Sequence, residues 1–187
     1  MPGADPRAMS HSWLFTGPPG SGRSLAAIDF AAALMCTDPE EPGCGRCEAC
    51  RAVLETKQHT DLVLVDPQEV IIPVDTVREV IGRAASLPTV APWRVVIFNN
   101  ADRLNNNGAN ALLKTVEEPP ARTVIIMCAP SDAPEDFSQT LRSRCRHLYI
   151  PSPSVESITA QLVSEGASDH DAHLAALTSL RHVGRAR

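Results

Sequence analysis

The chain has 187 residues, a formal net charge of −5 and 43% apolar residues. This length and balance can bury a core in one domain plus part of a second, and they exclude a disordered chain. No apolar run approaches the roughly 20 residues that span a bilayer, and residues 1–12 lack the layout of an export signal, so we expect a cytoplasmic protein. A net acidic chain also disfavours a dominant nucleic-acid binder, because phosphate contacts need clustered positive charge.

Strands and helices are predicted to alternate along the first 150 residues. Short apolar runs predict strands at 12–16, 62–65, 94–98, 123–127 and 147–150. Helices are predicted over 24–35, between Asp75 (a candidate N-cap) and Pro88, and over 109–116. Such alternation predicts an α/β fold with a parallel sheet covered on both faces. Residues 37–45, rich in proline, glycine and acid, are interpreted as an insertion.

The pattern changes after Pro151. Val155, Ile158 and Leu162 fall on one helical face, and residues 173–183 predict another helix. We therefore expect a core domain over residues 1–150 and a partial, truncated helical domain over residues 151–187.

A glycine-rich segment, Gly-Pro-Pro-Gly-Ser-Gly-Arg-Ser, joins the first strand to the first helix. It matches the phosphate-loop pattern Gly-x4-Gly-Lys-Ser/Thr at every fixed position but one. In such a loop the backbone N–H groups point at a phosphate, and the following helix adds its positive end. A plain turn is the alternative. The candidate phosphate-binding residues are Gly17, Gly20, Ser21, Gly22, Arg23 and Ser24.

The sequence differs from that of an active ATPase of this fold at two places. Arg23 replaces the lysine of the loop, and a planar guanidinium does not substitute freely for an ammonium. Asn99 and Asn100 follow the third strand, where an ATPase of this fold has an aspartate that holds Mg²⁺ and an acid that polarises water. Amides do neither well. We expect hydrolysis to be lost and leave ATP binding open.

Four of the six cysteines fall between residues 36 and 50. Cys36, Cys44, Cys47 and Cys50 supply the four thiolates of a tetrahedral, structural zinc site. Free thiols or disulfides are the alternative. Cys128 and Cys145 are isolated and are expected to be packed in the core.

Five sequence features follow one another along the chain. They are the glycine loop, the cysteine cluster, residues 99–104, Asn-Ala-Leu-Leu-Lys-Thr-Val-Glu-Glu-Pro-Pro at 110–120 and Leu-Arg-Ser-Arg-Cys at 141–145. Together they resemble the AAA+ core of bacterial clamp-loader subunits, the gamma/tau and delta-prime proteins of DNA polymerase III. The resemblance covers roughly residues 10 to 187. Because both acids after the third strand are replaced by amides, the sequence is more similar to delta-prime, which does not hydrolyse ATP, than to gamma/tau, which does.

This resemblance implies a P-loop AAA+ sheet flanked by helices, a zinc module after the first helix, and the start of a helical lid domain. From the resemblance we expect the family's C-terminal oligomerisation domain to be missing from these 187 residues. The implied partners are the other loader subunits (gamma/tau and delta) and, through the complex, the sliding clamp and primed DNA, with no membrane.

The resemblance also assigns a role to Arg144, in the Ser-Arg-Cys triplet. In the family this arginine reaches across a subunit interface to the γ-phosphate of the neighbour's ATP, as an arginine finger in trans. The alternative is a solvated basic face formed by Arg142, Arg144 and Arg146. Two other functions stay open: an active gamma/tau-like ATPase, and a zinc-dependent DNA-binding or regulatory module.

Family sensor residues are less clearly marked. The resemblance points to Ser131 after the fourth strand, and to Arg185 and Arg187 in the lid domain. Glu117 and Glu118, an acidic pair at a helix end, are interpreted as part of the family's packing signature.

Overall fold

The computed structural model describes residues 10–67 and 69–178, and this part of the chain contains a five-stranded sheet in the order β2-β3-β4-β1-β5. The strands are β1 (Ser12–Thr16), β2 (Leu62–Val65), β3 (Arg94–Phe98), β4 (Thr123–Ala129) and β5 (Arg146–Tyr149). Every neighbouring pair is parallel, which confirms the predicted sheet. The carboxyl ends of all the strands therefore meet at one edge, where ligands bind in open α/β sheets.

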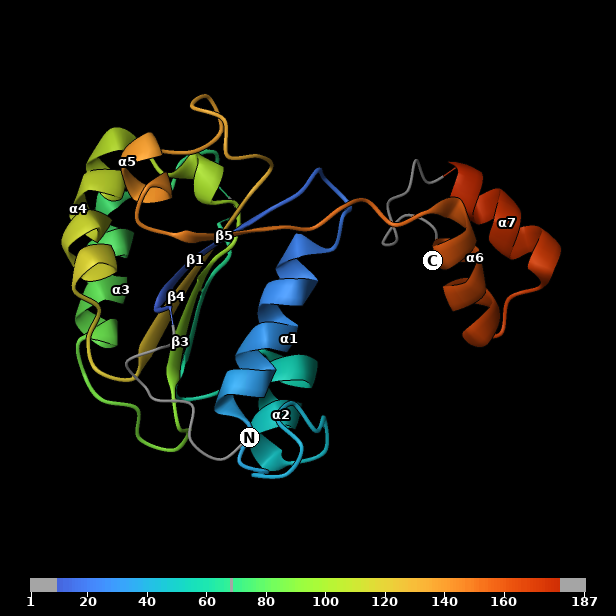
Figure 1. Cartoon of the computed structure of the whole chain (residues 1–187), viewed down its shortest axis with the longest axis horizontal. Coiled ribbons are helices and arrows are strands. Elements are labelled where there is room, and N and C mark those ends of the chain that lie inside the picture. The colour runs from blue at the N-terminus through green and yellow to red at the C-terminus, as the bar shows by residue number, and fades with distance from the viewer. Residues whose placement is uncertain (1–9, 68, 179–187) are drawn as a thin grey trace.

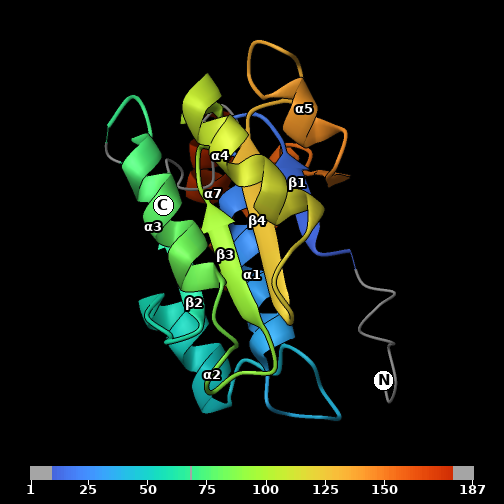
Figure 2. The ribbon, with the colours of Figure 1, turned by 90° about the vertical axis from the view of Figure 1, so that its left-hand side faces the viewer.

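Helices cover both faces of this sheet. The helical elements of the core are α1 (Arg23–Met35), α2 (Glu48–Arg51), the π-helix η1 (Ala52–Thr56), α3 (Val74–Ala84), the 3₁₀ turn η2 (Ala101–Arg103), α4 (Asn106–Glu117) and α5 (Gln139–Arg142). Helices α3 and α4 lie on one face, and α1 lies on the other with α2 at its carboxyl end (Figures 1 and 2). The three layers are those of a P-loop α/β domain.

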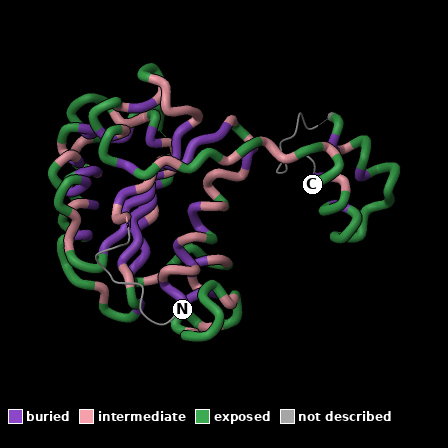
Figure 3. The backbone as a smooth tube through the Cα atoms, viewed as in Figure 1, coloured by how far each residue is buried: buried purple, intermediate pink, exposed green. Residues whose placement is uncertain are grey.

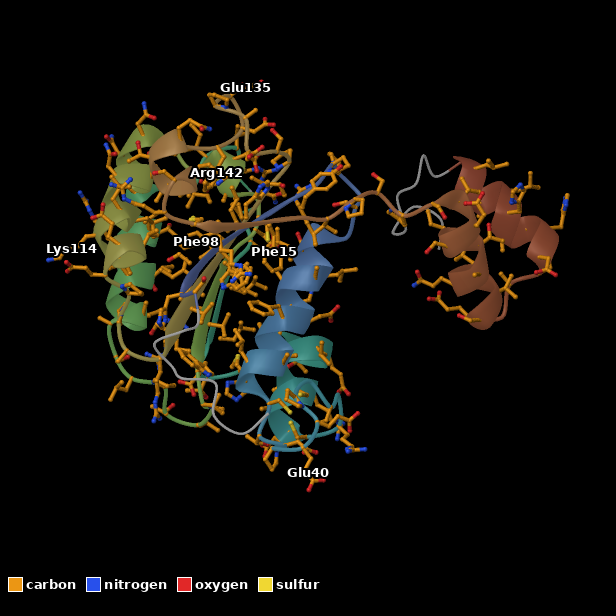
Figure 4. The ribbon with its side chains drawn as sticks, in the orientation of Figure 1. Phe15, Glu40, Phe98, Lys114, Glu135 and Arg142 are labelled. Carbon is orange, nitrogen blue, oxygen red and sulfur yellow. The ribbon has the colours of Figure 1, made fainter. Side chains whose placement is uncertain are left out.

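Side-chain alternation along the central strands builds two cores. On β3, Val96 and Phe98 pack on the side of α3 and α4, while Val95 and Ile97 pack on the side of α1. Phe15 of β1 belongs to the α1 side, opposite Phe98 (Figure 4). Burial is continuous through β1 to β4 and the inner faces of the helices (Figure 3), whereas β5, at the edge of the sheet, is mostly exposed. A strand buried on both faces reads as an unbroken apolar run, which is why these strands were predictable.

Some boundaries differ from those predicted. Asp75 is not the N-cap of α3: the helix begins at Val74, and Pro73 occupies the cap position with φ −61° and no side-chain bond. Proline supplies the φ angle of a helix start without help from a side chain. Helix α4 begins three residues before the predicted Ala109, because the Asn105 side chain caps the N–H of Gly108 at 2.8 Å. Neither α2, η1 nor α5 was predicted.

The amino ends of β2 and β3 are joined through a buried ion pair. Asp61 is fully buried, and its carboxylate accepts bonds of 2.7–2.9 Å from the N–H groups of Thr89, Val90 and Ala91 and from Nη2 of Arg94. Arg94 in turn donates to the carbonyls of Arg83 and Ser86. The pair fixes the loop between α3 and β3 against the sheet.

Beyond the sheet, α6 (Val155–Ser164) and α7 (Asp169–Thr178) pack on each other around Ile158, Leu162, Ala172 and Ala176. This helix pair stands apart from the sheet (Figure 1). The part of the second predicted helix after residue 178 lies outside the described residues. Within residues 10–67 and 69–178, no helix has both the length and the apolar character that crossing a membrane requires.

Candidate functional site

The glycine loop follows β1 at the carboxyl edge of the sheet, as predicted. A Cβ atom on Gly17 would lie 2.3 Å from the carbonyl oxygen of Ile150 and 2.5 Å from Oγ of Ser21, so the loop accepts only glycine there. Gly20 and Gly22 have φ of 85° and 86°, in the left-handed region that glycine adopts readily. Gly22 is also the N-cap of α1, which directs the positive end of that helix into the loop.

The arginine that replaces the loop lysine is turned back onto the loop. Nη1 of Arg23 donates to the carbonyl of Gly17 at 2.7 Å. Nε of Arg23 and Oγ of Ser21 are buried without a partner among the described residues. Both atoms are hydrogen-bond donors that the described part of the protein leaves unsatisfied, so they could bind an oxygen atom of a phosphate. The nearest cation of the loop is the Arg23 guanidinium itself.

The end of β3 holds amides where an ATPase would hold acids. Oδ1 of Asn99 is buried without a partner among the described atoms, and the backbone of Asn100 has a φ of 53° at the start of η2. The first carboxylate after β3 belongs to Asp102, which is exposed on η2. A neutral amide at this position holds Mg²⁺ less firmly than a carboxylate does and is a poor base for water.

The four clustered cysteines converge as predicted. Their sulfur atoms all lie within 4.8 Å of one another, and Sγ of Cys36 lies 3.7 Å from Sγ of Cys44 and 3.9 Å from Sγ of Cys47. Ligands about 2.3 Å from a tetrahedral zinc ion are separated by about 3.8 Å, so the spacing fits that geometry. Cys36 ends α1, and Cys47 and Cys50 bracket the start of α2. In Figure 4 the sulfur atoms lie beside α2, at the end of α1.

Backbone N–H groups in this module point at three of the four sulfurs. The N–H groups of Asp38, Cys47 and Cys50 lie 3.4 Å from the sulfurs of Cys36, Cys44 and Cys47, respectively. Hydrogen bonds from backbone groups, chiefly at Thr37 and Cys50, lower the pKa of Cys47 to about 6. Burial raises the pKa of Cys50 to about 12. Donors that stabilise a thiolate suit a metal ligand, because the thiolate is the form that binds metal. The cluster could therefore hold a metal ion.

Cys128 and Cys145 are buried apart from this module, which confirms the prediction that they are packed. Burial raises the pKa of each thiol to about 12.

Arg144 follows α5 and is anchored by its own chain. Its Nε donates to Oε1 of Glu117 at 2.5 Å, and its Nη1 donates to the carbonyl of Thr140 at 2.8 Å and to Oγ of Ser143 at 3.2 Å. The side chain retains 36% of its exposure. It lines a hollow of about 240 Å³ together with Ser12, the first residue of β1.

The three arginines of residues 142–146 have different partners, although Arg144 and Arg146 line the same hollow. Arg142 donates to Asp132 at 3.0 Å and lies 3.3 Å from Nδ1 of His147, whose Nε2 lies 2.6 Å from Oγ1 of Thr16. Arg146 lies over the ring of Trp13, 5.2 Å from its centre. Each guanidinium therefore has its own partner, and Arg142 is linked through His147 to the residue that precedes the glycine loop.

The sequence missed Glu117 as a partner of Arg144 because the two residues lie 27 positions apart in the chain. Glu117, interpreted as part of a packing signature, forms an ion pair with Arg144. Ser131, the sensor candidate, donates its hydroxyl to Asp136 at 2.6 Å and accepts from the N–H of Ala133. Arg185 and Arg187 lie outside the described residues.

A parallel sheet in this order, with a glycine loop between β1 and α1, defines a P-loop protein of the AAA+ class. Solved structures agree on the fold. A DNA polymerase III gamma subunit-related protein from Thermotoga maritima superimposes with a TM-score of 0.59 at 20% identity, over 91% of this chain and 54% of that one. The RuvB Holliday junction branch migration motor of the same organism superimposes with a TM-score of 0.58 at 17% identity, over 96% of this chain and 53% of that one.

Sequence comparison narrows the class to a family. The family model described as DNA polymerase III, delta subunit, matches residues 4–154, and the chain belongs to this family. The delta' subunit of DNA polymerase III from Pseudomonas aeruginosa is 35% identical over 165 residues, which cover 84% of this chain and 49% of that protein. The delta' subunit of Escherichia coli is 34% identical over 89% of this chain and 50% of that protein.

The gamma/tau subunit of Mycobacterium tuberculosis is 33% identical over 86% of this chain and 28% of that protein. The chain thus spans about half the length of the delta' relatives that it matches.

Proposed function

We propose that this chain acts as a delta'-like subunit of a clamp loader that does not hydrolyse ATP itself and lends Arg144 to the nucleotide of a neighbouring ATPase subunit. In the proposed assembly its partners are gamma/tau and delta subunits, and the complex places the sliding clamp on primed DNA. The arginine finger neutralises charge that develops on the transferred phosphoryl group.

The position of Arg144 relative to the glycine loop carries this proposal. Arg144 shares a hollow with Ser12, at the start of β1, whereas the loop begins after Thr16, at the end of the same strand. A five-residue strand spans about 13 Å. The guanidinium, bound to Glu117 and Thr140, is therefore held far from a phosphate in its own loop. An exposed cation held at the opposite end of the sheet is suited to a nucleotide on another subunit.

The loss of hydrolysis is supported by the residues around the loop. The Arg23 guanidinium donates to Gly17, and the amides of Asn99 and Asn100 occupy the end of β3. With amides at both positions, the end of β3 offers neither the carboxylate that would hold Mg²⁺ nor the one that would polarise the attacking water.

The cysteine module is proposed to hold a structural zinc ion through Cys36, Cys44, Cys47 and Cys50. Four thiolates leave no open coordination position, so the metal would stabilise the connection between α1 and α2 and take no part in catalysis. The distances among the sulfurs and the N–H groups directed at them support this assignment.

An ATP hydrolysis assay on the isolated chain with Mg²⁺ separates this function from that of an active gamma/tau-like ATPase. We expect no turnover above background. The matched control is Gly22→Asp, which places a side chain and a negative charge at the N-cap of α1, where φ is +86°. Turnover that is present in the wild type and disappears in this variant would show that the chain is itself an ATPase.

A further inference from the structure

The ion pair between Glu117 and Arg144 links the end of α4 to the segment after α5, and the proposed function assigns a role only to Arg144. Glu117 is the last residue of α4, and Arg144 comes just after α5, which packs against α4. Both side chains are partly exposed, with 45% and 36% of their surface accessible. An exposed ion pair contributes little to stability, so packing alone gives no reason for a carboxylate at this position.

One edge of the Arg144 guanidinium is hydrogen-bonded within the described part of the chain, and the other edge is not. Nε is bound by Glu117, and Nη1 is bound by the carbonyl of Thr140 and the hydroxyl of Ser143. Nothing in residues 10–67 or 69–178 bonds to Nη2. The backbone is also fixed, since the N–H of Arg144 donates to Leu141 at 3.0 Å and the next residue, Cys145, is buried.

We propose that Glu117 is a positioning residue for Arg144: its carboxylate fixes the guanidinium so that the Nη2 edge is presented to the phosphate of a nucleotide on the neighbouring subunit. This inference rests on the proposed function, because it gives Glu117 an effect only through the finger. A donor held in place before the reaction stabilises developing charge without reorganising, whereas a long, free arginine must first lose its side-chain entropy.

The neighbouring acid provides a matched control. Glu118 is exposed at the end of α4 and is engaged through its backbone N–H, which donates to the carbonyl of Lys114 at 2.8 Å. Glu117→Gln keeps an oxygen that can accept from Nε of Arg144 but removes the charge. Glu117→Ala removes the acceptor altogether. Together with Glu118→Ala, these two variants separate the effects of the position of the acid, its hydrogen bond and its charge.

The test measures ATP turnover by the full-length protein assembled with the ATPase subunits of its loader, and separates kcat from KM. Glu117→Ala is expected to lower kcat at the site that Arg144 completes by about tenfold, as expected for a misplaced catalytic group. KM for ATP should stay constant, because the nucleotide is held by the neighbour's own loop. Glu117→Gln should recover most of the loss, and Glu118→Ala should match the wild type.

Combining the variants distinguishes the failure of this inference from the failure of the proposed function. With Arg144→Ala already present, Glu117→Ala should cause no further loss. If Arg144→Ala slows turnover but Glu117→Ala does not, the finger stands and Glu117 has no positioning role. If Glu117→Ala slows turnover equally with and without Arg144, its effect does not pass through the arginine and the inference is overturned. If Arg144→Ala leaves turnover unchanged, both proposals fail.

Discussion

At the scale of single residues, two arginines occupy very different environments in this chain. Arg94 is buried and is paired with Asp61 inside the fold, where its role is structural. Arg144 is held at the surface by an exposed acid and keeps one edge free. Sequence alone could identify the second, because the Ser-Arg-Cys triplet is a family motif. It could not reveal Glu117 or Asp61 as partners, since they lie 27 and 33 residues from the arginines that they bind.

Removing the charge of Asp61 should destabilise the whole core. In Asp61→Asn an amide N–H₂ group would face backbone N–H donors, and the Arg94 charge would be left buried. The free energy of unfolding should fall by about 3–5 kcal/mol, as for other broken buried pairs. Urea denaturation at pH 7 measures the change. Asp75→Asn is the control: Asp75 is paired with Arg78 on the helix surface, so the expected loss is below about 1 kcal/mol. Equal losses in the two variants would contradict this account.

The same carboxylate predicts a dependence on pH. Burial opposes the charged form of Asp61, but the hydrogen bonds from Ala91, Val90, Thr89 and Arg94 outweigh it, and its pKa lies well below the ordinary value. Its stabilisation is therefore complete above the unfolded-state pKa of about 3.9 and is lost as the pH falls toward the folded value. Below about pH 4 the wild type should lose stability more steeply than Asp61→Asn. Parallel curves of unfolding free energy against pH would refute this.

At the scale of elements, long buried strands were predictable and short helices were not. Strands β1 to β4 are visible in the sequence as apolar runs because both faces of the sheet are covered there, whereas β5, at the edge of the sheet, is mostly exposed. Helices α2 and α5 have four residues each, too few for a periodic pattern, and their positions depend on Cys47 as a cap and on packing against α4. The four cysteines could be predicted to lie together as candidate metal ligands, because they are close in the sequence and their spacing can be read without knowing the fold.

The module makes a prediction about metal content. Purified protein should contain a single zinc ion per chain, and Cys47→Ser should weaken its retention against a chelator, while Cys145→Ala, outside the module, should not. Zinc affinity should fall as the pH is lowered, because protons compete for the thiolates. Metal analysis by mass spectrometry, with thiol titration, measures both. Metal-free protein with two disulfides among these cysteines would overturn the assignment.

At the scale of the whole molecule, the sheet separates the two groups of candidate site residues. The glycine loop and the amides of Asn99 and Asn100 lie at the carboxyl edge, and Arg144 lies by the start of β1. The sequence contained both motifs, but their separation follows from the strand order, which depends on pairing between residues far apart in the chain.

The most direct test of this account is ATP turnover at the site that Arg144 completes, in a loader assembled from the full-length chain and its partner subunits. Arg144→Ala should reduce hydrolysis at that site by at least about a thousandfold, as for other arginine fingers, and should leave assembly intact. In the steady state this appears as the loss of one site's share of the total turnover. Unchanged turnover in a fully assembled complex would contradict the account.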